Sequence, residues 1–150
     1  MRSVATDKAP PAAGPYSQAV ECDGIVYVSG QIPVDPSTGK MPEGAAAQAR
    51  QALENLRNVV EASGSSMGDV LKVTVFLKDI GTFAEVNAVY AEFFSQPCPA
   101  RSCVGCADLP KGSLVEIDAV ARIKKRGTHR WATVLGLTSF PTTASLTKRL

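Results

Sequence analysis

The sequence predicts an α+β domain in which two helices pack on one face of a mixed β-sheet. Three features predict this fold: segments in which apolar and polar residues alternate, two longer segments with apolar residues at helical spacing, and turns rich in glycine and proline between them. The chain has 150 residues, of which 45% are hydrophobic and 20% charged, as in an ordinary globular domain.

The first part of the chain predicts an extended arm followed by a hairpin. Residues 1–16 are rich in proline, alanine and glycine. The apolar runs 17–22 and 25–29 flank the pair Asp23-Gly24, which favours a two-residue hairpin turn because both positions take a positive φ. Residues 31–44 are again rich in proline and glycine, and we expect a loop there.

A first helix is predicted over residues 45–63, with Gly64 as its C-terminal stop. Its apolar residues recur at steps of three and four and form one face: Ala49, Leu53, Leu56 and Val60. Charged and amide side chains occupy the other side. Because only one face is apolar, we expect this helix to lie on a sheet.

A strand and a second helix follow. Residues 70–78 alternate, and one face of the predicted strand holds Leu71, Val73, Val75 and Leu77. The second helix is predicted over residues 82–94, with an apolar side made of Phe83, Val86, Val89 or Tyr90, and Phe93. Either Asp79 or Thr82 could cap it.

Residues 101–108 and 114–124 predict two more strands, joined by the turn at 109–113. If the turn is a hairpin, Arg101 faces about Arg122 and Glu116 faces about Ala107, an offset on the order of 20 Å. If Arg101 and Glu116 act on one small ligand, we expect them to meet across a subunit interface. The half-apolar second face of the last strand also favours an oligomer.

The sequence predicts a domain over residues 1–126 and an atypical C-terminal extension over 127–150, for which a disordered tail, an appendage and an unusual transcript end stay open. The formal charge of +2 argues against a dedicated nucleic-acid-binding protein. No run of 18 apolar residues and no secretory signal occur, so we expect a cytoplasmic protein with reduced cysteines. A mitochondrial location stays open because the N-terminus has one arginine and several small residues, and a peroxisomal one because the terminal Lys-Arg-Leu faintly resembles a peroxisomal address.

Few residues suggest chemistry by spacing alone. His129 is the only histidine and Cys103-x-x-Cys106 the only close cysteine pair, so we expect no metal site. No glycine-rich phosphate loop is present. Arg101 and Glu116 are charged residues in apolar strand contexts, although each also fits a surface position on its strand.

The most distinctive motif of the sequence is Pro99–Val104 followed by Leu109 and Val115–Ile117. Further motifs are Gly14–Ala19, Val28–Pro33, Gln48–Leu53, Lys72–Phe76 and Val86–Tyr90. Together these spaced motifs, over about residues 3–124, resemble the reactive-intermediate deaminases, the Rid or YjgF family.

The resemblance implies a fold like that of the small chorismate mutases and a homotrimer with ligand clefts between subunits. It implies hydrolysis, without a cofactor, of enamines and imines such as 2-aminoacrylate to 2-keto acids and ammonia. It further implies that Arg101 binds the substrate carboxylate, that Glu116 positions or activates water, and that the Cys103 main chain holds that water or the nitrogen. Tyr16, Ser29, Gly30 and Asn87 would line the pocket.

Two other functions stay open on sequence grounds. One is a regulatory module that binds small carboxylates without turnover, which Arg101 would serve equally well. The other is an RNA-directed ribonuclease or translation inhibitor, which the near-neutral domain and the lack of a histidine pair disfavour. Glu116 separates the enzyme from the module, because a carboxylate-binding protein gains nothing from a second negative charge nearby.

Overall fold

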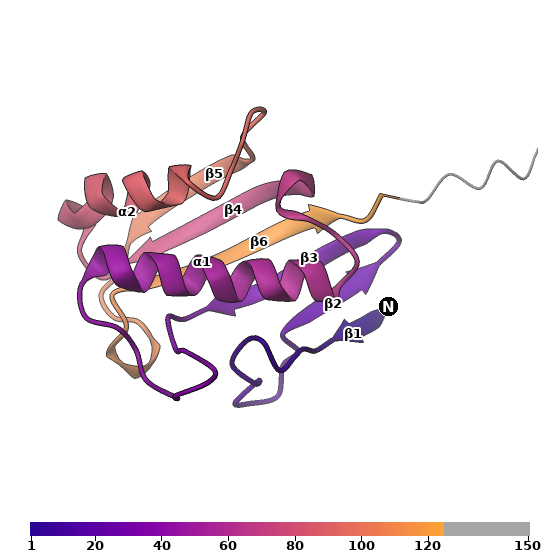
Figure 1. Cartoon of the computed structure of the whole chain (residues 1–150), viewed down its shortest axis with the longest axis horizontal. Coiled ribbons are helices and arrows are strands. Elements are labelled where there is room, and N and C mark those ends of the chain that lie inside the picture. The colour runs from indigo at the N-terminus through magenta and orange to yellow at the C-terminus, as the bar shows by residue number, and fades with distance from the viewer. Residues whose placement is uncertain (125–150) are drawn as a thin grey trace, which may run out of the picture.

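The structure is a computed structural model that describes residues 1–124. Six strands form one sheet in the order β1-β2-β3-β6-β4-β5. The strands β4 and β5 are parallel, and all other neighbours are antiparallel. Both α-helices lie on the same face of this sheet, which confirms the predicted α+β architecture (Figure 1). The predicted extension at 127–150 lies outside the described residues.

The elements follow the predicted order, with one additional strand at the start. The strands are β1 Arg2–Val4, β2 Ala19–Cys22, β3 Ile25–Gln31, β4 Val70–Leu77, β5 Ala100–Gly105 and β6 Val115–Arg122. The α-helices are α1 Ala45–Ala62 and α2 Phe83–Ala91, and three 3-10 turns lie at η1 Met67–Asp69, η2 Ile80–Thr82 and η3 Pro110–Gly112. The start of the predicted arm is therefore strand β1, which pairs with β2 at the edge of the sheet.

The turn of the first hairpin and the C-terminal end of the first helix lie where the sequence predicts them. Asp23 and Gly24 have φ values of 53° and 81°, and the turn joins β2 to β3 in antiparallel register. At the end of α1, Gly64 has a φ of 91°, and the amides of Gly64 and Ser65 donate to the carbonyls of Glu61 and Val60. This pair of bonds is the Schellman motif, which satisfies the last carbonyls of the helix.

The predicted apolar face of β4 is wrong at its first position. A bulge between Val70 and Lys72 shifts the register against β6. Val70 is consequently buried, whereas Leu71 is 43% exposed. Buried and more exposed side chains alternate strictly only from Val73 onward, because the bulge inserts one residue into the strand before that point.

The predicted hairpin between the last two strands is wrong. Strand β6 lies between β3 and β4, and β5 instead pairs with β4 in parallel. The turn η3 carries the chain past the end of β4 instead of folding it back on β5. A central position suits β6, since its helix-facing side chains are all buried: Val115, Ile117, Ala119 and Ala121.

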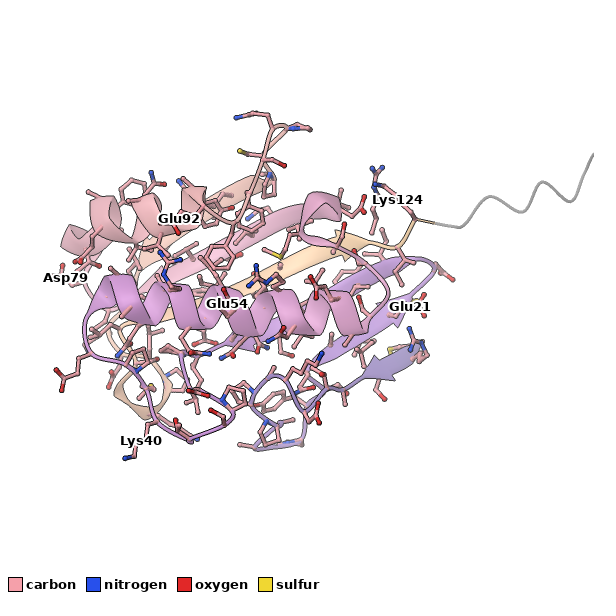
Figure 2. The ribbon with its side chains drawn as sticks, in the orientation of Figure 1. Glu21, Lys40, Glu54, Asp79, Glu92 and Lys124 are labelled. Atoms are coloured by element: carbon pink, nitrogen blue, oxygen red, sulfur yellow. The ribbon has the colours of Figure 1, made fainter. Side chains whose placement is uncertain are left out.

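The second helix is shorter than predicted, and its apolar side differs. Phe83 is 40% exposed, and Phe94 is buried in place of Phe93. Asp79 accepts a hydrogen bond from the Gly81 amide and so caps η2, the turn that leads into α2. Glu92, at the end of α2, points toward α1 and forms a 2.7 Å ion pair with Arg50 (Figure 2).

The face of the sheet opposite the helices has no cover from residues 1–124 (Figure 1). Tyr27 on β3 is 54% exposed there, and Val104 on β5 is 43% exposed. Charged side chains of β6 lie beside them, so this face is half apolar, as its sequence predicts. Such a face favours contact with another protein surface.

Candidate active site

Arg101 lies on the edge strand β5 and faces the helices. Its register partner on β4 is the buried Val73, so the two side chains share a face. The Arg101 Nη1 donates a 2.8 Å hydrogen bond to Asn87 Oδ1 on α2. No carboxylate within residues 1–124 forms an ion pair with Arg101. Its charge therefore stays available for an anionic ligand.

Cys103 follows on the same face of β5. Its thiol has a raised pKa because burial disfavours the thiolate more than the positive charge of Arg101 favours it. Cys106 donates its amide to the Leu77 carbonyl, so strand alternation turns the Cys103 amide outward from the sheet edge. A neutral thiol and an outward amide are compatible with a main-chain role for Cys103.

An open cleft of about 560 Å³ adjoins Arg101. Asn87 and Tyr90 of α2 line it, together with Cys98 and Pro99 from the segment before β5. This cleft is large enough for a small organic acid. We name Arg101, Cys103 and Asn87 the arginine cluster.

Glu116 lies on β6 and faces away from the helices. Its register partner on β4 is Phe76, one position out of phase with the buried Val75. Across from it, the β3–β6 register shifts between Val28 and Gln31, which makes Ser29 and Gly30 a bulge. A Cβ atom on Gly30 would lie 2.8 Å from Glu116 Cδ and closer still to Oε1. The missing side chain of Gly30 thus leaves the space that the Glu116 carboxylate occupies.

Tyr16 and Ser29 lie beside Gly30, whose missing side chain makes room for this carboxylate. The Ser29 hydroxyl donates a 2.6 Å hydrogen bond to the Ser17 carbonyl, which ties the bulge to the end of the arm. Tyr16 is exposed, its hydroxyl accepts from the Ala13 amide at 3.2 Å, and it lines a cavity of about 130 Å³ with Gly30. We name Tyr16, Ser29, Gly30 and Glu116 the glutamate cluster.

The buried Gln18 holds the arm that carries Tyr16. Its Nε2 has two hydrogens and lies 3.0, 3.2 and 2.7 Å from the carbonyl oxygens of Thr6, Ala9 and Pro10, so one N–H is shared between two of them, and its Oε1 accepts from the Thr6 amide at 2.7 Å. One side chain therefore satisfies four main-chain groups of a segment that has no regular secondary structure.

The pKa of Glu116 is raised, first by partial burial and second by the negative charge of Asp118. Asp118 lies two residues along the same face of β6 and accepts a 3.2 Å hydrogen bond from the Thr74 amide. A carboxyl with a raised pKa exchanges protons more readily near neutral pH than an ordinary surface glutamate.

The two clusters do not meet within one chain. Arg101 is level with Val73 of β4, whereas Glu116 is level with Phe76 and lies on the opposite face. Two strand spacings and three residues separate their Cα atoms, on the order of 14 Å. The hairpin register behind the predicted separation is wrong, but Arg101 and Glu116 are far apart because β4 lies between their strands.

Comparison with known proteins identifies the fold and the family. A family model described as endoribonuclease L-PSP matches residues 6–123. The 2-iminobutanoate/2-iminopropanoate deaminase of Salmonella typhimurium is 52% identical over 123 residues, which cover 80% of this chain and 96% of that protein. The chain belongs to the Rid (YjgF) family.

Solved Rid structures share this fold. RidA from an Antarctic Psychrobacter species has a TM-score of 0.80 and 46% sequence identity, over 82% of this chain and 100% of that chain. TdcF of E. coli, solved with bound serine, has a TM-score of 0.78 and 46% identity, over 81% of this chain and 98% of that chain.

Among the described residues of this Rid chain, no three His, Cys, Asp or Glu side chains gather in a way that could hold a metal ion. Within residues 1–124, no helix is both long enough and apolar enough to cross a membrane.

Sequence reasoning missed three residues beside the clusters of this Rid domain. Phe83 and Tyr90 lie against Arg101, and Asp118 lies beside Glu116. The spacing of these residues in the sequence could have identified all three. Phe83, Asn87 and Tyr90 are four and three residues apart, which is one stripe of a helix, and Glu116 and Asp118 are two apart on one strand face.

Replacement of Gly30 by alanine should displace the Glu116 carboxylate and leave the Rid fold intact. Gly30 has no positive φ, so alanine fits the backbone, and only a flexible side-chain end must move. We expect little change in the thermal unfolding midpoint. If Glu116 transfers a proton in the reaction proposed below, kcat should fall by about tenfold or more. Gly68→Ala, whose Cβ meets no atom closer than 3.8 Å, is the control. Full activity in Gly30→Ala would show that the position of Glu116 does not matter.

Proposed function

We propose that the chain hydrolyses enamine and imine intermediates of the 2-aminoacrylate type to 2-keto acids and ammonia, without a cofactor. The observation that carries the proposal is the Arg101 guanidinium, which has no acidic partner within residues 1–124 and borders an open cleft. The deaminase name of the Salmonella relative, at 52% identity, supports the same reaction.

In this mechanism Arg101 grips the planar carboxylate of a 2-imino acid with two parallel hydrogen bonds. Glu116 orients a water molecule and takes a proton from it as the oxygen attacks the imine carbon. That proton passes to the imine nitrogen, which gives a carbinolamine. The proton of the new hydroxyl is then transferred to the amine, so that the carbon–nitrogen bond breaks as the carbonyl forms, and the products are ammonia and a 2-keto acid. The outward Cys103 amide holds the water or the nitrogen, while Tyr16, Ser29, Gly30 and Asn87 line the pocket.

We further propose that each site forms between two subunits of a homotrimer. One subunit supplies the arginine cluster from the β5 edge, and its neighbour supplies the glutamate cluster. The supporting observations are the opposite faces of Arg101 and Glu116 and the uncovered half-apolar sheet face. A heterologous contact that closes into a ring gives every subunit both roles.

A coupled assay tests the activity. A serine or threonine dehydratase generates the imine, and keto-acid release is followed with and without this protein. We expect faster release that chelators leave unchanged. Binding of the keto acid without any acceleration would favour a carboxylate-binding module.

The description of the matching family model as an endoribonuclease gives RNA cleavage as the second candidate. We expect no RNA cleavage and only weak RNA binding that is lost at physiological salt, since few phosphate contacts are available. Tight binding that resists salt, or cleavage by protein free of contaminating nucleases, would favour the ribonuclease.

The raised pKa of Glu116 predicts the acid limb of the pH–rate profile. If ionised Glu116 accepts the proton of water, kcat/KM should fall as the pH drops through that pKa, above the usual range of a glutamate. Asp118→Asn removes the neighbouring negative charge but keeps an oxygen for the Thr74 amide. The acid limb should then move to lower pH. If the acid limb of the pH–rate profile does not move in Asp118→Asn, a group other than Glu116 is responsible for that limb.

A further inference from the structure

Three residues of α2 surround the Arg101 guanidinium. Its carbon lies 4.5 Å from the ring centroid of Tyr90 and 5.5 Å from that of Phe83. Asn87, which lies between Phe83 and Tyr90 along α2, accepts the 2.8 Å hydrogen bond from Nη1 at its Oδ1. Both ring distances are within the range of cation–π attraction. An exposed arginine on an edge strand thus has three separate restraints from one helix.

These restraints leave one edge of the guanidinium free. Asn87 occupies Nη1, and no residue within 1–124 accepts a hydrogen bond from Nε or Nη2. Those two nitrogens form the side-on fork that matches a carboxylate in bidentate geometry. The aromatic rings restrict the plane of the group, so this fork has a fixed direction before any ligand arrives.

Tyr90 is the more buried of the two rings. It is 7% exposed, and its ring lies 4.5 Å from that of Phe94. Burial raises the pKa of Tyr90 to about 12, against the opposing effect of the Arg101 charge, so the phenol stays neutral. Its hydroxyl has no hydrogen-bond partner within residues 1–124. The ring of Tyr90, and not its hydroxyl, is therefore the part that acts on Arg101.

We propose that Phe83 and Tyr90 are positioning residues that fix the plane of the Arg101 guanidinium and so set the affinity for the substrate carboxylate. The inference rests on the proposed function only in taking a small carboxylate as the ligand. A preset guanidinium loses less side-chain freedom on binding, and this benefit is the same for bound substrate and transition state. Loss of a ring should consequently raise KM and leave kcat nearly unchanged.

The experiment compares ring removal with hydroxyl removal. Phe83→Leu and Tyr90→Leu remove an aromatic face, whereas Tyr90→Phe keeps the face and removes only the hydroxyl. Phe93→Leu is the matched control, because Phe93 also lies on an arginine, Arg57, at 5.3 Å, but does not contact Arg101. Three quantities are measured: KM and kcat in the coupled assay, the Kd of 2-oxobutanoate by calorimetry, and the NMR shift of the Arg101 Nε–H, assigned by its loss in Arg101→Lys.

We expect Phe83→Leu to raise KM and the Kd of 2-oxobutanoate by about two- to tenfold, the range of one cation–π contact. Its Arg101 Nε–H signal should move downfield as the ring current is lost, with kcat nearly unchanged. Phe93→Leu should match the parent protein in all three measurements, and Tyr90→Phe should keep the parental Arg101 Nε–H signal because its ring is still present. Phe83→Leu removes an exposed ring, so the test does not depend on whether Tyr90→Leu folds.

An unmoved Nε–H signal together with unchanged KM and Kd in Phe83→Leu would overturn the inference. A fall in kcat with constant KM would also overturn it, because the rings would then act on the chemical step. If the parent protein binds 2-oxobutanoate but hydrolyses no imine, a weaker Kd and a moved signal in Phe83→Leu would still support it. The proposed deaminase function alone would fail in that event.

Discussion

Arg101→Ala is expected to lower kcat/KM for 2-imino acids by about 10²-fold or more, because the carboxylate then loses a bidentate, charge-assisted contact. Arg101→Lys should also lose most activity, since an ammonium keeps the charge but not the fork geometry. Neither change should alter the thermal unfolding midpoint much, because Arg101 is exposed and has no acidic partner within residues 1–124. Steady-state kinetics at low substrate concentration check both variants.

The control for these variants is Arg57→Lys. Arg57 also lies over an aromatic ring, that of Phe93, but contacts neither cluster. It should retain parental kinetics. Near-normal turnover by Arg101→Lys at low substrate concentration would mean that Arg101 does not clamp the carboxylate.

Mixing two inactive variants is expected to restore activity. Arg101→Ala retains a complete glutamate cluster, and Glu116→Ala retains a complete arginine cluster. If each site takes one cluster from each of two neighbours in a ring, random assembly of equal amounts leaves about a quarter of the sites intact. Activity should therefore rise from the level of either variant alone to about a quarter of the parent.

Subunit exchange must be demonstrated in the mixture, for example by mass spectrometry of isotopically labelled chains. An inactive mixture with proven exchange would contradict a shared site. A monomeric parent protein with full activity would contradict it as well. The negative control is Arg101→Ala refolded together with a variant that carries both Arg101→Ala and Glu116→Ala. No site in that mixture could contain an arginine at position 101.

Local elements of this fold could be predicted because their signals are local. The turn Asp23-Gly24, the apolar face of α1 and the stop at Gly64 each depend on residues that are close in sequence. The bulges at Leu71 and at Ser29-Gly30 could not be predicted, since each depends on how a strand fits its neighbour.

Pairing between distant strands was the main failure of sequence reasoning. The turn at residues 109–113 has the composition of a hairpin turn, but composition does not state which strands it joins. Parallel pairing of β4 with β5 depends on the intervening α2, which returns the chain to the same end of the sheet.

The site shows the same division. The resemblance of motifs identified Arg101 and Glu116. The face of the sheet on which each lies depends on pairing with Val73 and Phe76, and the local sequence does not predict this pairing. Asn87 was selected from a motif alone, whereas its contact with Arg101 depends on the docking of α2.

The central position of β6 also bears on how this chain folds as it is synthesised. Strands β1 to β3 form one half of the sheet and β4 with β5 the other, and β6 alone joins them. The ribosome makes β6 last among the described strands, so a nascent chain shorter than about 120 residues holds two half-sheets, each with an open edge. Until β6 emerges, those edges are available for wrong pairing with other nascent chains. Completion of the sheet is therefore a late event in the synthesis of this chain.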